Sequence, residues 1–467
     1  MSSETNENEQ IMKPFSTVQL LNFCLGFFGL QFAWQMRIIL SGPVTENLGA
    51  SPLIFGLIWL AGPVTGMVVQ PIIGNLSDNT HTIFGKRRPY LLAGAIFASL
   101  ALWAFPNSAL LSEKLAHFLH IPEPVFGGLI IAAIMIWVID ACVNAAQGPY
   151  RALVPDLVPP QQHSLANAYL SFAIGLGSVV AAGTAPFLKY VCNYQMSIEA
   201  QFIMAALAFS LAMLWTCITI REHKYKKNEV KTDIKAEETL KNATSFIQKV
   251  IDFFRSSPEV GKICTLQLFT WIGIMSLNIF FTQYAIHTVY GIPDLTTVSE
   301  EIKNSYTAAI SKATNFSSIC FAAQNLICFL VSIPIGLLST KFGNKRVHFI
   351  ALMSLALAFV GMGLYQTPGF VLICMAVSGI GWASVLALPF AMLSEFIKKG
   401  SEGSVMGIFN IFIAGPQVLV CTLLAWFISQ CVFDIPAGIN YHWEYAFFIG
   451  AITLLIAAVI TNLIKEK

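Results

Sequence analysis

The sequence predicts an all-α membrane protein in which twelve transmembrane helices form two half-repeats of six. Three observations support this class. The 467-residue chain is 56% hydrophobic and only 11% charged, whereas a soluble domain has about 25% charged residues. Apolar runs long enough to span a bilayer as a helix recur along the chain. One long charged stretch, 221–261, divides these runs into two sets of six.

Each predicted span is an apolar run bounded by polar or turn-forming residues. A polar, acidic tail at 1–15 precedes the first span and lacks the basic segment of a cleavable signal peptide. Spans one to six form a predicted bundle at 16–220, and spans seven to twelve form a second at 262–464, before a short tail at 465–467. The spans are 16–41, 53–75, 89–106, 126–150, 165–188, 200–220, 262–288, 313–338, 347–366, 369–394, 405–430 and 442–464.

Lysine and arginine residues predict the orientation. If the N-terminus is cytoplasmic, the segments on that side hold 22 of the 27 basic residues, the opposite segments hold four, and Arg37 lies within a span. Cytoplasmic loops of membrane proteins carry this excess of basic residues. Both termini are therefore expected in the cytoplasm, with 221–261 as a cytoplasmic linker.

The two halves resemble each other in sequence. "GNLSDNTHTIFGKRRP" follows span two, and "GLLSTKFGNKR" follows span eight. After spans four and ten, an alanine precedes an acid by four residues, as in Ala152 with Asp156 and Ala391 with Glu395. Parallel half-repeats of this kind are typical of secondary transporters that bind their substrate between the halves.

Span four carries a polar stripe. Asp140, Asn144, Gln147 and Arg151 recur at intervals that place them within about 60° of one another on a helix. Such a stripe is expected to face a cavity or another helix, since facing lipid is too costly. A buried acid can exchange protons near neutral pH, so we interpret Asp140 as a proton-coupling residue. The alternative is a structural polar contact.

Span one combines amides with an aromatic ring. Gln31 and Gln35 share a helix face, and Trp34 is about 60° away. Amides bind sugar hydroxyls and a ring stacks on an apolar sugar face, although interhelical packing explains the same residues. Arg37 has three interpretations: it pairs with Asp140, binds an anionic substrate, or extends its charge toward the membrane surface.

Several motifs carry a family resemblance. Gly74, Asp78, Gly85 and the basic cluster 86–88 resemble the loop signature of the major facilitator superfamily. The motifs "GLQFAWQM", "WLAGPVTGMVVQPIIGNLSD", "FGKRRPYLLAGA", "DACVNAAQGPYRAL", "GIGWASVLALPFAMLSE" and "NIFIAGPQVLV" occur in order across both halves. Together they resemble the sucrose/proton symporters of plants and their animal sugar-transporter relatives, within the glycoside–pentoside–hexuronide group.

The resemblance implies the major facilitator fold and sugar uptake coupled to protons, from one cavity with alternating access. It gives coupling roles to Asp140 and Arg151 and expects spans one, four, seven and ten to line the cavity. Gln283 departs from the family pattern because it stands where many members carry an acid, and Arg37 departs from it as well. Further candidate substrate contacts are Asn144, Gln147, Asn278, Gln283, Asn325, Trp382 and Asn410.

Charged residues at the predicted cytoplasmic ends of the spans have a separate interpretation. Opposite charges there can hold an inner gate closed in one state and separate when it opens; the alternative is anchoring at the membrane surface. The gate candidates are Asp78, Arg87, Arg88, Asp156 and Glu395. In span seven, His287 is expected at the outer end in an interfacial position.

These observations predict a proton-coupled sugar symporter, for a disaccharide such as sucrose or maltose or a related glycoside. The alternative is a carrier for another polar or anionic solute, by uniport or with sodium. No phosphate-binding loop or nucleophile motif suggests a pump or an enzyme, and the ten scattered cysteines suggest no disulfide framework or metal site. We expect no cofactor and no nucleic acid, a monomer in the lipid bilayer, and a plasma membrane or bacterial inner membrane.

Overall fold

The computed structural model describes residues 14–80, 82–122, 127–220, 222, 258–296, 299–396, 402–436 and 438–465. A first group of helices precedes the linker and a second group follows it. The first group consists of α1 (Thr17–Asn47), α2 (Pro52–Trp59), α3 (Ala61–Asp78), α4 (Arg88–Ala104), α5 (Ser108–Leu119), α6 (Gly127–Leu157), the 3-10 turn η1 (Pro160–Gln162), α7 (His163–Tyr190) and α8 (Ile198–Thr219).

The second group contains long helices, two π-helical turns and a hairpin. Its strands are antiparallel, with Val432 opposite Tyr441. The elements are α11 (Pro258–Tyr284), η2 (Ala285–Val289), α12 (Glu300–Phe342), α13 (Asn344–Leu364), α14 (Pro368–Ser394), α15 (Glu402–Leu419), η3 (Val420–Leu424), α16 (Ala425–Gln430), β1 (Val432–Ile435), β2 (Gly438–Tyr441) and α17 (Tyr445–Leu463).

The helices have the dimensions of membrane spans. Eleven described segments are long and apolar enough to cross a membrane, and the pair α4–α5 makes a twelfth if it counts as one span. The sequence predicts span three at 89–106, and α4 ends close to that limit. The helix α5, which turns away from α4 by 87°, was not predicted. Phe105, Pro106 and Asn107 separate the two helices, and α5 carries too many polar residues to be recognised as a span.

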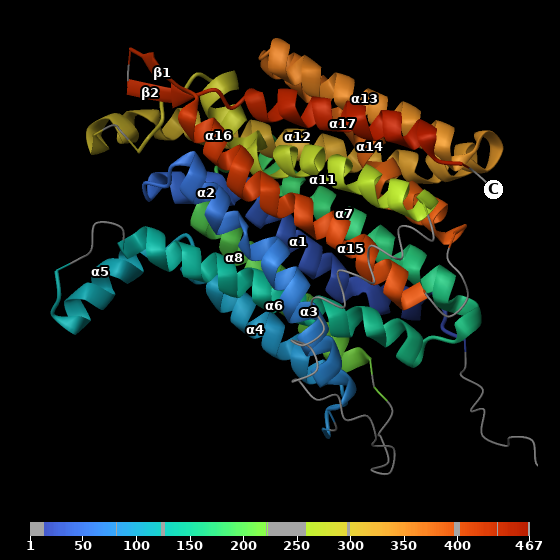
Figure 1. The fold of residues 1–467 in the computed structure, drawn as a ribbon. Coiled ribbons are helices and arrows are strands. Elements are labelled where there is room, and N and C mark those ends of the chain that lie inside the picture. Colours follow the sequence, from blue (N-terminus) through green and yellow to red (C-terminus); the bar gives the residue numbers. More distant parts are fainter. Residues whose placement is uncertain are drawn as a thin grey trace, which may run out of the picture.

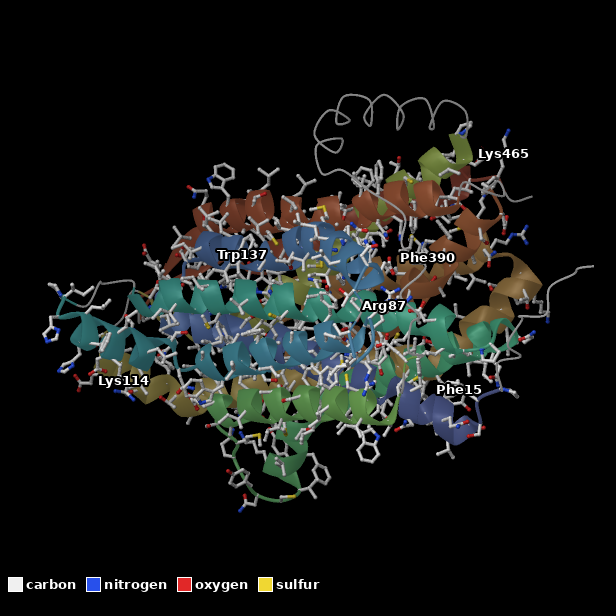
Figure 2. The ribbon with its side chains drawn as sticks, turned by 90° about the horizontal axis from the view of Figure 1, so that it is seen from below. Phe15, Arg87, Lys114, Trp137, Phe390 and Lys465 are labelled. Atoms are coloured by element: carbon white, nitrogen blue, oxygen red, sulfur yellow. The ribbon has the colours of Figure 1, made fainter. Side chains whose placement is uncertain are left out.

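The two helix groups lie side by side along their length (Figure 1). They meet through α7 against α12, α1 against α11, and α2 against η3 and α16. The hairpin, α2 and α5 lie at one end of the bundle, here called the hairpin end, and the C-terminus lies at the other (Figure 1). Lys114 of α5 is accordingly far from both Phe15 and Lys465 (Figure 2). This arrangement places a long interface between the groups.

Local sequence explains where α1 begins and how the groups approach each other. Ser16 caps α1 by accepting a hydrogen bond from the Gln19 backbone, while the Gln19 side chain accepts one from Ser16 N–H, a reciprocal cap that satisfies two helix-end donors. At the hairpin end, a Cβ at Gly56 would overlap Ala425 and the Cys421 carbonyl. Glycine at this position therefore permits the close packing of α2 on the second group.

Candidate functional site

A buried ion pair lies inside the first helix group. Arg37 of α1 and Asp140 of α6 are joined by a 2.6 Å hydrogen bond from Arg37 Nη2 to Asp140 Oδ2. Both side chains have an exposed fraction of 0%. Of the three interpretations of Arg37, the structure shows the pairing with Asp140. A buried pair of this kind is costly to break on one side only, because the remaining charge then has no partner.

Two tryptophans surround the guanidinium. The Arg37 Cζ atom lies 4.3 Å from the Trp59 ring centroid and 5.2 Å from that of Trp34. Gly62 lies beside the same site, since a Cβ there would be 3.6 Å from Asp140 Oδ2 and 3.8 Å from the Trp34 ring. The site thus combines one acid, one base and aromatic faces.

Several polar atoms at this site have unused hydrogen-bonding capacity. Arg37 Nε and Nη1, Asp140 Oδ1 and Trp59 Nε1 are buried and make no hydrogen bond to any residue that the structure describes. Buried polar atoms are nearly always hydrogen-bonded, because leaving them unpaired costs about 1–3 kcal/mol each. Three donor atoms and one acceptor atom are therefore grouped around a single ion pair, where a polar solute could satisfy them.

The two amides of the span-four stripe, Asn144 and Gln147, face α3. Asn144 donates to Thr65 Oγ1 at 3.0 Å and accepts from Gln70 Nε2 at 2.6 Å. Gln70 Nε2 also donates to Gln147 Oε1 at 3.2 Å. These amides join two helices, which is the packing alternative for Asn144 and Gln147. Trp59, Thr65 and Gln70 were not among the sequence candidates, although all three lie within the quoted span-two motif.

Arg151 is separated from Asp140 by three helical turns, about 16 Å along α6. Its guanidinium carbon lies 5.5 Å from the Phe27 ring centroid of α1. The preceding residue, Tyr150, is fully buried; its hydroxyl donates to the Phe23 carbonyl and accepts from Gly26 N–H. Tyr150 therefore fixes the position of α6 against α1, and this contact also positions the next residue, Arg151, beside α1.

The other span-one candidates point toward different neighbours. Gln31 packs beside Gly177 of α7, where an added Cβ would lie 3.2 Å from the Gln31 Cβ. Gln35 is buried, and Asn325 Nδ2 of α12 approaches its Oε1 at 3.4 Å, a contact that joins the two helix groups. Gln35 Nε2 makes no hydrogen bond to a described residue. Gln35 and Asn325 are thus brought together, as expected of residues between the groups.

The remaining candidates of the second group are dispersed. Asn278 is half-buried, and its Nδ2 lies 4.0 Å from the Met275 sulfur. Trp382 of α14 packs edge-on against Trp271 of α11, with centroids 5.9 Å apart. Asn410 of α15 is exposed. The structure does not bring these three together with the Arg37–Asp140 pair.

Gln283 belongs to a buried polar cluster at the hairpin end. Its Nε2 donates to Glu46 Oε2 at 2.5 Å, and His287 Nε2 lies 2.8 Å from the same oxygen. Leu295 N–H donates to Glu46 Oε1 at 3.1 Å. The expectation of an interfacial His287 is wrong, because the residue is 2% exposed and packs between the helix groups. Glu46 was missed because the predicted first span ends at residue 41, whereas α1 continues to Asn47.

The charged gate candidates form a cluster in the loop after α3. Arg87 pairs with Asp78, and its Nε donates to Asp156 Oδ2 at 3.0 Å. Lys86 Nζ lies 3.2 Å from the other Asp156 oxygen. Glu222, which was not among the sequence candidates, accepts hydrogen bonds at 2.7–3.1 Å from the backbone N–H groups of residues 86–88. These hydrogen bonds fix the backbone of the basic segment.

The second group has a smaller counterpart. Asn344, at the start of α13, donates to Glu395 Oε1 at 3.1 Å. This contact lies within the second group, just as the Arg87 cluster lies within the first. The Arg88 Nε atom makes no hydrogen bond to a described residue. These contacts hold each loop to its own helix group, so gating remains a prediction for these residues.

Comparison with known proteins agrees with this architecture. A family model described as MFS/sugar transport protein matches residues 27–300, and one described as Major Facilitator Superfamily matches residues 295–466. The chain belongs to the MFS/sugar transport protein family. Its family is one of multi-pass membrane transporters rather than enzymes, as the sequence motifs had indicated.

Individual relatives extend over most of the chain. Sucrose transport protein SUT2 of Oryza sativa subsp. indica is 26% identical over 426 residues, which cover 84% of this chain and 83% of that protein. Sucrose transport protein SUC4 of Arabidopsis thaliana is 25% identical over 422 residues, covering 84% and 80%. The family match and these relatives confirm the resemblance drawn from the motifs.

Solved structures share the fold. A D-xylose-proton symporter superposes with a TM-score of 0.62 at 15% identity, over 97% of this chain and 98% of that one. The nucleoside transporter NupG gives a TM-score of 0.60 at 12% identity, over 97% and 100%. At this level of identity the likeness establishes the mostly helical major facilitator fold.

Proposed function

We propose that this protein is a secondary active transporter that carries a sugar together with protons by alternating access. The observation that carries the proposal is the fully buried Arg37–Asp140 pair, with two tryptophans around it and with polar atoms that make no hydrogen bond to any described residue. Tryptophan faces suit the apolar faces of a sugar ring, and the free donor and acceptor atoms suit its hydroxyls. The sucrose transport proteins among its relatives support a disaccharide or related glycoside as the substrate.

The ion pair supplies a route to proton coupling. When Asp140 is ionised, its charge is compensated by Arg37. When Asp140 binds a proton, the pair is neutralised on one side, so the guanidinium can turn its N–H groups to a substrate hydroxyl while the acid donates a hydrogen bond. If Arg37 has neither the ionised Asp140 nor a substrate hydroxyl as a partner, its charge is buried and uncompensated, which is costly. Proton binding and sugar binding are therefore mutually favourable at this site.

The surrounding residues have secondary roles in the proposal. Gln35 and Asn325 bring an amide pair from the two helix groups to the interface, where both can contact solute. Arg151, about 16 Å along α6 from Asp140, provides a second cation on the route from that acid to the Arg87 loop. Gln31, Asn278, Trp382 and Asn410 remain candidate contacts of a state in which the groups have moved.

Alternating access then requires the helix groups to move as two bundles. In the proposal, residues 16–220 and 262–464 are these bundles, 221–261 links them, and both termini are cytoplasmic, so the hairpin end faces outward. The Asp78–Arg87–Asp156 cluster, with Arg88 and Glu395, stabilises the inner gate in one state. The proposed transporter is a monomer in a plasma membrane or bacterial inner membrane.

One observation favours a second candidate, a carrier for an anionic solute. Arg37 has two buried N–H-bearing nitrogens without a hydrogen bond to a described residue, and a guanidinium binds a carboxylate with two parallel hydrogen bonds. Such a carrier would need a competing anion to displace Asp140 from Arg37, and it could work as a uniporter or with sodium.

Uptake into liposomes tests the proposal. A pH gradient of one unit, inside alkaline and without a membrane potential, stores about 1.36 kcal/mol per proton. One-to-one symport therefore accumulates labelled sucrose or maltose about tenfold. The proposal is contradicted if sugars only equilibrate, and accumulation of glucuronate in their place would establish the anionic candidate.

A further inference from the structure

Glu46 fastens the two helix groups together at the hairpin end. It lies in the last turn of α1 and is 3% exposed. Among the described residues, three groups hydrogen-bond to its carboxylate, and all belong to the second helix group: the Gln283 amide, the His287 ring and the Leu295 backbone. This set of contacts, here called the Glu46 latch, exists only while the hairpin end is closed.

The hydrogen bonds of His287 determine how many protons the latch holds. His287 Nδ1 lies 2.9 Å from the Ile292 carbonyl oxygen. A carbonyl can only accept, so Nδ1 carries a hydrogen. On the other side of the ring, Nε2 and Glu46 Oε2 are 2.8 Å apart. A hydrogen bond between them requires one further proton, held either by the imidazole or by the carboxyl.

The surroundings keep this arrangement in place. Asn440 of β2 donates to the Ile292 and His287 carbonyls, at 3.3 and 3.1 Å. The Trp443 ring stacks on the imidazole at 5.7 Å with an interplanar angle of 19°. Because the Gln283 amide and Leu295 N–H also donate to Glu46, the contacts of the carboxylate among the described residues are all with donors. The closed latch therefore contains one proton more than a glutamate beside a neutral histidine.

We propose that Glu46 and His287 form a proton-binding site distinct from Asp140, which closes the hairpin end only when it holds one proton. The inference rests on the alternating access of the proposed function, but not on the identity of the solute. A proton taken up from the hairpin side on closing returns to the same side on opening. The latch therefore sets the balance between conformations and adds nothing to the protons carried across.

The size of the effect follows from linkage. Opening exposes both side chains to water, where a glutamate and a histidine titrate near about 4.3 and 6.5. Above about pH 6.5 the open latch holds no proton, and closing takes one up. The ratio of closed to open molecules then falls about tenfold for each unit of pH increase.

Other titratable groups lie at the hairpin end, and their titration must be distinguished from that of the latch. Asp294, in the loop that carries Leu295, is buried, and its burial together with the nearby Glu46 charge raises its pKa. Burial raises the pKa of Tyr441 in β2 to about 12, so it stays protonated in the range of interest. His442 pairs with Glu444 at 2.7 Å, and on α12 Lys312 lies 5.7 Å from the Tyr290 ring.

A distance measurement across the hairpin end tests the proposal. The full chain in nanodiscs, without solute or gradient, carries spin labels at Phe118→Cys of α5 and Asp434→Cys of β1, with Cys192→Ser and Cys431→Ser to prevent labelling of those thiols. Pulsed electron–electron double resonance measures the distance between the two labels and so gives the closed and open fractions. The measurement runs from about pH 6.5 to 8.5, above the ordinary histidine pKa. The expected result is that the ratio of closed to open molecules falls about tenfold for each unit of pH increase. A ratio that does not change with pH overturns the proposal.

Variants assign the proton. In Glu46→Gln, the amide donates to neutral His287 without an added proton, so the closed fraction should no longer depend on pH. Asp140→Asn, Asp294→Asn and His442→Gln should retain the tenfold slope. A slope that survives Glu46→Gln, or that disappears in any of the three controls, overturns the assignment to the latch. Asp140→Asn also separates the two proposals, because it is expected to lose coupled transport while the latch still titrates.

Discussion

Asp140→Asn is expected to destabilise the folded protein, because it leaves the Arg37 charge buried without a partner. The substitution keeps the side-chain shape but removes the charge that compensates Arg37, and neither side chain of the pair is exposed. Removing one member of a buried pair costs about 3–5 kcal/mol. The free energy of unfolding of the purified protein, from reversible denaturation in detergent at neutral pH, should fall by about that amount.

A matched substitution measures how much of this cost arises from burial. Asp156 also pairs with an arginine, at 3.0 Å from Arg87 Nε, but its side chain is 22% exposed. Asp156→Asn should cost about 0–1 kcal/mol, as for a surface pair, because Asp156 is partly solvated and Arg87 keeps its pairing with Asp78. The double variant Arg37→Leu with Asp140→Asn removes both charges and should be more stable than Asp140→Asn alone, although it loses the contacts of the guanidinium with Trp34 and Trp59.

The same variant separates coupling from transport. With Asp140 permanently neutral, uptake driven by a pH gradient should be lost, while exchange of preloaded labelled sugar for external sugar should continue. The reasoning is refuted if Asp140→Asn costs no more than Asp156→Asn, if the double variant is less stable than the single one, or if Asp140→Asn accumulates sugar like the native protein.

Three further predictions concern the scaffold. Gly56→Val should prevent closure at the hairpin end, because the valine side chain would overlap Ala425 and the Cys421 carbonyl. The closed fraction in the spin-label experiment should become undetectable, and normal closure would show that this contact is not required. Tyr150→Phe should lower the free energy of unfolding by about 1–3 kcal/mol, because the Phe23 carbonyl and Gly26 N–H lose a buried partner. A decrease below about 0.5 kcal/mol, the size of ordinary surface changes, would contradict the role of Tyr150 in joining α6 to α1. Glu222→Ala should increase proteolysis within 82–88, since three backbone donors lose their acceptor; Glu199→Ala, at the first turn of α8, is the control, and equal cleavage of both variants would exclude the effect.

The fold class could be predicted because bilayer-length apolar runs have a strong signature in sequence. Each span needs a long apolar segment whatever its neighbours are. The repeated loops and the family motifs then indicated which superfamily the chain resembles. Interruptions were harder to predict. The polar composition of α5 concealed it, and the predicted first span stopped at residue 41 because Ser41, Gly42 and Pro43 resemble a helix end although α1 continues through Pro43.

The candidate site could be predicted only where one helix carries the signal. Asp140 is conspicuous because it is an acid in an apolar run, and Arg37 was recognised as a possible partner for the same reason. Glu46 and His287 are 241 residues apart in the chain, and nothing in the sequence of either span indicates the other. The missing acid at Gln283 was the one available clue, since an amide there can donate to an acid supplied by α1.

Proton movement caused by sugar alone is the most direct test of symport. The native protein and Asp140→Asn are reconstituted in liposomes with a pH dye inside and no ion gradient, and external sucrose, maltose, glucose, glucuronate or glutamate is added to each. Acidification of the lumen by a sugar, in the native protein and not in the variant, is the predicted result. Sugar exchange without acidification in the native protein, or equal acidification in Asp140→Asn, would contradict coupling through the Arg37–Asp140 pair.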